Sequence, residues 1–332
     1  MSTPDAARDL MSDQELEAAF GGDLGPAPSA SAAPSALGAP QTGQAVVFHP
    51  EHRPTWTEFA RGWEIGIYRD PVLCGVTAGV VLGMLGVFIV LRRAVFVTAA
   101  ISQSAALGVA LAFLLHARTD IALPPSVAAL GLALIAALTL AFQSERLRVP
   151  REALIGFAYL AASAAAILVG DRITQEAHDI SAILFGTAVV VRPADLLLVA
   201  TAGIVVLCVV GVAHRGLLFA GFDPEGARVQ GLPVRSLETV LWTLVALEVS
   251  VATRALGALP VFAFAVLPAL SALSLVERPA GALLIASLFG GTAGGLGYLA
   301  AFFFEFPVGA CQAVVVTLGF LVALPLALAR AR

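Results

Sequence analysis

Long apolar runs separated by short polar segments make up most of the chain from residue 71 onward. A helix needs about 20 predominantly apolar residues to cross the hydrocarbon core of a bilayer. The pattern therefore predicts an all-α polytopic membrane protein, and because several runs abut closely it predicts about 8–9 transmembrane helices. The candidate spans are Pro71–Leu91, Ala94–Leu115, Pro124–Phe142, Glu152–Gly170, Asp195–Ala213, Glu238–Leu256, Ala258–Val276, Ala280–Phe303 and Val308–Ala329.

The polar segments divide the chain into three parts. Residues 1–55 are acidic and rich in Ala, Pro and Ser, with too few large apolar groups to fold, so we expect a disordered tail. Residues 56–70 contain amphipathic aromatics and Arg, which suit either an interfacial helix or a loosely ordered juxtamembrane segment. Residues 71–329 form the transmembrane domain. Within it, Ile180–Val191 has only 12 residues, so it is too short to span the bilayer.

Composition supports the membrane assignment. The chain is 59% hydrophobic and 13% charged, with a mean hydropathy of +0.91, whereas a soluble domain carries about 25% charged residues. This excludes disordered and disulfide-rich secreted proteins. No basic patch indicates binding to nucleic acid. The three cysteines are isolated within apolar runs, which is typical of cysteines that pack as small apolar side chains.

Arginine supplies all of the Lys+Arg total, and its distribution predicts the orientation. Clusters follow the first, third, fifth, seventh and last candidate spans, while the alternate connections are poorer. Loops rich in Arg are retained in the cytoplasm, which places the C-terminus inside. With nine spans the acidic tail is outside; otherwise one apolar run does not span.

Enzyme signatures are absent from the sequence. It contains no phosphate-binding loop ending in Gly-Lys-Ser/Thr, no His-Glu-x-x-His and no Gly-x-Ser-x-Gly. We therefore expect a protein that is not an enzyme. If ATP drives its action, a separate chain must hydrolyse the ATP.

The longest cytoplasmic connection, residues 214–238, contains a compact helix signal. Asp223 can cap a short helix, Pro224 suits its first position, and Gly231 can end it. Such a helix is either a rigid protrusion that a soluble partner could push or an ordinary connector.

Four stretches of the sequence resemble the metal-ion permease subunits of ABC importers, the ABC-3 family, and together they cover about residues 71–325. The stretches are Gly83–Arg93 with Leu107–Ala110, Leu184–Gly186 with Pro193–Asp195, Asp223–Gly231, and Val251–Ala272 with Phe306–Gly309.

The resemblance implies a multi-pass inner-membrane permease that imports zinc, manganese or iron. It further implies a second permease copy, an extracytoplasmic solute-binding protein and an ABC ATP-binding subunit that uses ATP. This chain would then hold no cofactor, and the metal would be its cargo. The residues expected to couple it to the ATPase are Asp223, Glu225, Arg228 and Gly231.

The sequence departs from the family at the metal-binding positions. Family members typically carry Asp and His four residues apart in the second helix, whereas this chain has Ala99 and Gln103. Carboxylate and imidazole are the usual donors for divalent metals. A hydrated metal could instead follow a path of polar side chains, or the same groups could bond helix to helix. These groups are Thr98, Ser102, Gln103, Ser104 and Thr187.

Glu248 lies in the middle of a predicted span and is a further candidate for the path, because a carboxylate in lipid is costly and commonly functional. It could face a cavity, pair with Arg254 or find a partner on another helix. A loop containing Glu176, His178 and Asp179 is either an outer metal-collecting site or simply solvated. The alternative to an importer is an ATP-independent carrier or a membrane scaffold that has lost metal selectivity.

Overall fold

The structure, a computed structural model, describes residues 54–119, 122–141, 150–172 and 191–330. The tail and most of Ile180–Val191 lie outside these ranges. The described residues form only helices joined by short connections. The helices are α2 (Trp56–Ile65), α3 (Arg69–Leu91), α4 (Val95–Thr119), α5 (Pro125–Ala141), α6 (Arg151–Asp171), α8 (Pro193–Phe222), α9 (Pro224–Val229), α10 (Val234–Leu256), α11 (Ala258–Leu275), α12 (Pro279–Phe304) and α13 (Val308–Arg330).

Eight of the described helices are long and apolar enough to cross a membrane. The remaining candidate span corresponds to α5, whose apolar part, Pro125–Leu140, is shorter. The prediction of an all-α protein with 8–9 spanning helices is therefore confirmed.

The spans differ from the sequence prediction mainly in α8. This helix continues past the expected end at Ala213 to Phe222, because Leu217 and Ala220 give its last turns an apolar face that is buried. Asp223 is then the only residue between α8 and α9. The first part of the long connection is consequently helical and continuous with a membrane helix, and α9 follows after one non-helical residue.

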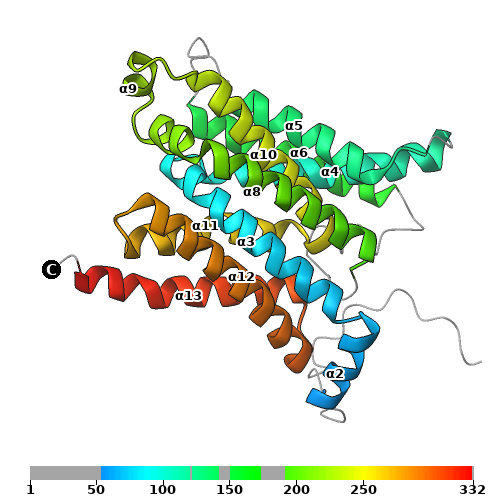
Figure 1. Cartoon of the computed structure of the whole chain (residues 1–332). Coiled ribbons are helices and arrows are strands. Elements are labelled where there is room, and N and C mark those ends of the chain that lie inside the picture. The colour runs from blue at the N-terminus through cyan, green and yellow to red at the C-terminus, as the bar shows by residue number, and fades with distance from the viewer. Residues whose placement is uncertain (1–53, 120–121, 142–149, 173–190, 331–332) are drawn as a thin grey trace, which may run out of the picture. The chain divides into compact units, whose positions relative to one another are not determined.

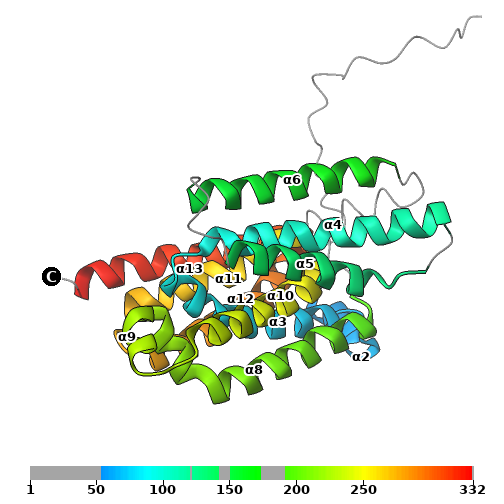
Figure 2. The same cartoon turned by 90° about the horizontal axis from the view of Figure 1, so that it is seen from above.

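Helix α3 lies at the centre of the bundle and contacts α8, α10, α11 and α12. Figure 2 shows α6 on the outer side of α4, with α8 on the opposite side of the bundle. In both views α9 and α2 lie at opposite ends of the helices, and the C-terminus lies at the α9 end (Figures 1 and 2).

Small residues allow α3 and α12 to pack backbone to backbone. A Cβ atom on Gly79 would collide with the carbonyl oxygen of Gly290, and a Cβ atom on Gly294 would collide with that of Gly75. In lipid, where apolar burial gives little drive for association, such close approach is a main source of packing energy. The glycines of α3 and α12 therefore bring these two helices into backbone contact.

Aromatic side chains join α2 to the end of α12. Phe59 and Tyr68 stack with ring centroids 5.7 Å apart, and Phe302 contacts both rings. Thr55 begins α2 with a reciprocal cap to Glu58. The start of α3 and the end of α12 therefore meet at one end of the bundle.

Candidate functional site

A cavity of about 690 Å³ lies between α4, α6 and α11. Its walls are mostly apolar, with an Arg and a Glu and a few polar groups among them. Ligand sites commonly combine apolar walls with a small number of placed polar groups. The residues that define its character are Arg93, Phe96, Ala99, Ser102, Gln103, Glu152, Tyr159, Ser163 and Phe262.

Ala99 and Gln103 both line this cavity, as expected for residues four apart on one face of a helix. The Gln103 Oε1 atom is buried and has no hydrogen-bond partner among the described residues. An amide oxygen is a neutral acceptor, and alanine supplies no donor at all. The face of α4 that meets the cavity therefore carries one amide, whose Oε1 atom is buried and unpaired among the described residues, and neither a carboxylate nor an imidazole.

The hydroxyl groups of α4 are already occupied. Thr98 Oγ1 donates to Val95 O at 2.7 Å, Ser102 Oγ to Thr98 O at 2.9 Å and Ser104 Oγ to Ala100 O at 2.8 Å. Only Ser102 of these three belongs to the cavity lining. Ser102 and Gln103 therefore both line the cavity, whereas Thr98 and Ser104 do not.

Several predicted metal-site residues lie outside the described residues. Thr187 is one, and the outer loop with Glu176, His178 and Asp179 is another. Within the part of the chain that the structure describes, no group of three His, Cys, Asp or Glu side chains is arranged to hold a metal.

Glu248 lies where α10 meets α3 and α8. It is 0% exposed, and neither carboxylate oxygen has a hydrogen-bond partner among the described residues. A Cβ atom on Gly203 of α8 would lie 4.0 Å from its Oε2 and 3.0 Å from Val81 Cγ2 of α3. Glu248 is not among the residues that line the cavity, and Arg254 pairs with a residue of α8 instead.

The helix predicted between Asp223 and Gly231 is present as α9. Asp223 Oδ1 accepts a hydrogen bond from Gly226 N at 2.8 Å, and Pro224 occupies the first turn. Gly231 follows the helix with φ +81°, a conformation that favours glycine. The prediction of a capped helix is confirmed.

The two faces of α9 differ. Ala227 is buried against Ala220 and Val234, which fixes the helix to the ends of α8 and α10. Glu225 and Arg228 are exposed on the outer side. The result is a short helix with charged side chains on its outer side and an apolar contact with α8 and α10 on the other.

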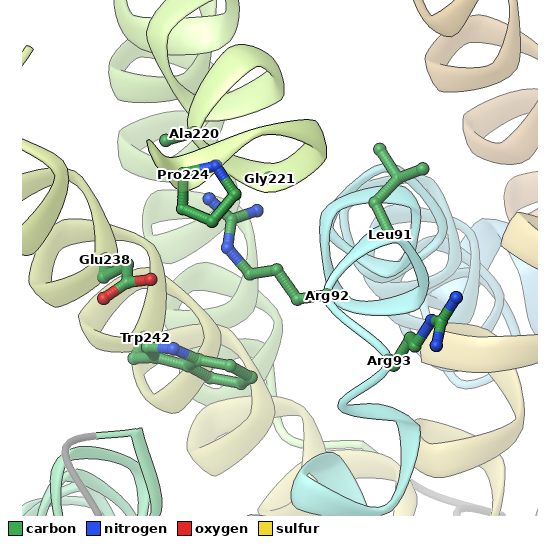
Figure 3. Close-up of a pocket in the computed structure, with 8 residues that line it drawn as sticks. All are labelled: Leu91, Arg92, Arg93, Ala220, Gly221, Pro224, Glu238 and Trp242. Carbon is green, nitrogen blue, oxygen red and sulfur yellow. The ribbon is translucent and has the colours of Figure 1, made fainter. Parts of the chain in front are cut away.

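A smaller cavity of about 240 Å³ lies behind α9, lined by Leu91, Arg92, Arg93, Ala220, Gly221, Pro224, Glu238 and Trp242 (Figure 3). In Figure 3 the Arg92 side chain extends toward Gly221 and Pro224, whereas Arg93 points away. Burial lowers the pKa of the Arg92 guanidinium, and the Glu238 carboxylate opposes that shift.

The sequence did not identify the contact that Arg92 makes with α8. Its Nη2 atom donates to the carbonyl oxygen of Leu217 at 3.0 Å. The adjacent pair of arginines marks a cytoplasmic end, but nothing in the local pattern tells which helix the guanidinium reaches.

Comparison with known proteins shows to which family this architecture belongs. Residues 66–327 match the ABC 3 transport family. The chain is 29% identical over 260 residues to "Manganese transport system membrane protein MntC" of Listeria innocua, covering 78% of this chain and 90% of that protein. It is 28% identical over 253 residues to "Chelated iron transport system membrane protein YfeD" of Yersinia pestis, covering 76% and 83%.

A solved structure has the same fold. PsaBC from Streptococcus pneumoniae in complex with Fab superposes with a TM-score of 0.72 at 24% identity, covering 81% of this chain and 95% of that chain. The family match spans all the described membrane helices except the last three residues of α13, and it includes α9 and the cavity residues of α4. This chain therefore belongs to the ABC 3 transport family.

Proposed function

We propose that this chain is the membrane-spanning permease subunit of an ATP-driven importer of divalent metal ions, namely zinc, manganese or iron, in the inner membrane. Family membership and the names of its relatives, which describe manganese and chelated-iron transport, support this substrate class. The observation that carries the proposal is α9, a capped helix with charged residues exposed on one side and an apolar contact to the bundle on the other.

The ATPase would bind at α9. Asp223 fixes the start of the helix, Glu225 and Arg228 offer exposed charges, and Gly231 permits the turn that follows. Because only Asp223 separates α8 from α9, a displacement of α9 would be passed directly to a membrane helix. ATP is used by that partner, and this chain supplies the moving pathway without a catalytic step.

The orientation follows from the ends of the bundle. The start of α3 meets the end of α12, and the end of α3 meets the last turns of α8. Arginines are denser at the α9 end, so that end faces the cytoplasm under the positive-inside rule. The other end, where α2 lies, would then face the extracytoplasmic solute-binding protein, with α2 (the interfacial segment of residues 56–70) at the outer membrane surface and residues 1–55 attached to it as a separate tail.

The metal path would run along the cavity beside α4, shared with a second permease copy. Ser102 and Gln103 line it directly, whereas the hydroxyl groups of Thr98 and Ser104 bond to backbone carbonyls of α4 outside the cavity lining. Thr187 and Glu248 remain candidates for other parts of the path. Alternating access would follow from ATP-driven movement of α9, which opens the cavity first to one side and then to the other.

The test is metal uptake by proteoliposomes that contain this chain, its ATPase and its solute-binding protein. Radioactive Mn²⁺, Zn²⁺ and Fe²⁺ are each supplied outside, with ATP or without it inside. We expect ATP-dependent accumulation of at least one ion. Equal uptake without the ATPase would instead favour the alternative, an ATP-independent carrier, and no uptake of any ion would favour a scaffold.

A further inference from the structure

The turn between α3 and α4 contains two adjacent arginines that reach different parts of the molecule. Arg93 has φ +52°, and the turn is closed by hydrogen bonds from Arg93 N to Val90 O at 2.9 Å and from Ala94 N to Ile89 O at 3.1 Å. A left-handed conformation is uncommon for a residue with a Cβ atom. The turn is short and tightly bonded, so Arg92 and Arg93 are held on opposite sides of it (Figure 3).

Arg92 fastens the end of α3 to the segment that carries α9. Its Nη2 atom bonds to Leu217 O at 3.0 Å, and its Nη1 atom bonds to Phe88 O of its own helix at 3.3 Å. Leu217 lies one and a half turns before the junction of α8 with α9. A movement of α9 that displaces this part of α8 therefore displaces the acceptor of Arg92.

Gly221 leaves the space that this contact needs. A Cβ atom on Gly221 would lie 2.9 Å from Nη1 of Arg92, so the guanidinium, at the flexible end of its side chain, would have to move away from its present position. By contrast, a Cβ atom on Gly211, three turns earlier on the same helix, would meet nothing within 4 Å. The guanidinium is thus seated against bare backbone at the point where α8 approaches α9.

Arg93 acts on the other side of the turn. Its side chain lines the 690 Å³ cavity beside α4, the same cavity that Ser102 and Gln103 line. Arg92 lines the 240 Å³ cavity behind α9. Arg93 borders this smaller cavity as well, so the two-residue turn lies between the region that holds α9 and the wall of the larger cavity.

We propose that Arg92 is a positioning residue that transmits the displacement of α9, through its bond to Leu217 and the Arg92–Arg93 turn, to the wall of the transport cavity. This proposal rests on the proposed function, because it assumes that an ATPase moves α9. It adds a specific physical connection between that movement and the cavity, which contacts of α9 alone do not supply.

The test compares Gly221→Ala with the matched variant Gly211→Ala in the complete reconstituted transporter. The measurement is the number of ATP molecules hydrolysed per Mn²⁺ ion taken up, together with the amount of ATPase that co-purifies. We expect Gly221→Ala to retain the ATPase and its hydrolysis but to raise the ratio by about fivefold, within the range of coupling energies that such contacts carry. Gly211→Ala should leave the ratio unchanged.

A second variant separates transmission from folding. If Gly221→Ala does not assemble, Gly221→Ala combined with Arg92→Ala removes the clash, and we expect this variant to assemble with a raised ratio because the bond to Leu217 is gone. The proposal is overturned if an assembled variant that disrupts Arg92 hydrolyses as many ATP molecules per Mn²⁺ ion as the parent does. It is also overturned if none of these variants assembles. A parent transporter that shows no ATP-dependent uptake overturns the proposed function instead, so the two failures are distinguishable.

Discussion

Arg254 on α10 forms an ion pair with Asp195 on α8, with 3.1 Å between Nη2 and Oδ1. Both side chains are partly buried, at 22% and 14% exposed. The pair joins the start of α8 to the end of α10, at the end of the bundle opposite α9. It also explains why Glu248, six residues before Arg254, does not take that arginine as its partner.

Removing one member of this pair should destabilise the protein. A hydrogen bond between charged groups is worth about 1.5–3 kcal/mol, so Arg254→Ala and Asp195→Ala should each lower the apparent Tm in detergent. The double variant should cost less than the sum of the two, as interacting neighbours do. Arg61→Ala serves as the control, because Arg61 on α2 is exposed to solvent and exposed charges contribute little to stability. Additive losses at positions 195 and 254 would contradict the interaction.

Glu248 should lower the stability of the fold, and it should contribute to metal uptake if it belongs to the path. A buried polar group without a partner costs about 1–3 kcal/mol, so Glu248→Met should raise the apparent Tm. If the carboxyl group belongs to the path, the same variant should lose metal uptake. Glu305→Gln, which removes an exposed carboxylate at the end of α12, is the control. Unchanged uptake with a raised Tm would remove Glu248 from the path.

Gln103→Ala should lower metal uptake by about tenfold, the effect of losing an interaction of about 1.4 kcal/mol, while assembly with the ATPase is kept. The reason is that the Gln103 Oε1 atom is buried at the cavity without a partner among the described residues. Ser104→Ala is the matched control, because its hydroxyl donates to Ala100 O and does not line the cavity. Equal uptake by both variants would exclude an amide contact with the cargo.

The membrane helices could be predicted from the sequence, whereas the contacts between them could not. Apolar runs of about 20 residues indicate spans directly, and Asp223, Pro224 and Gly231 indicate α9 because capping depends on neighbours in sequence. The bond from Arg92 to Leu217 joins residues 125 positions apart. Local periodicity carries no information on which carbonyl such a side chain will reach.

The candidate site shows the same division. The i, i+4 spacing predicts that Ala99 and Gln103 share a face, and both line the cavity. The cavity also includes Glu152 and Tyr159 of α6, which no pattern in α4 could indicate. The extension of α8 was missed because His214 and Arg215 interrupt its apolar run while the turns beyond them remain helical and partly buried.

The cap of α9 should be required for coupling. Asp223→Ser keeps a capping oxygen, whereas Asp223→Ala loses about 1 kcal/mol of helix stability, and Asp223→Arg also reverses the charge. We expect transport-linked ATP hydrolysis to fall in the order Ser, Ala, Arg. Gly231→Pro should uncouple as well, because proline cannot adopt φ +81°. Full coupling in both Asp223→Arg and Gly231→Pro would show that α9 does not receive the ATPase.

The most direct measurement of the central claim is site-specific photo-crosslinking in intact cells, with a photoreactive amino acid at Glu225 on α9 and, as the control, at Phe304, which is 67% exposed at the other end of the bundle. The account predicts that position 225 crosslinks to the cytoplasmic ATP-hydrolysing subunit and that position 304 does not. Crosslinking of position 304 to the ATPase, or of position 225 only to extracytoplasmic protein, would contradict it.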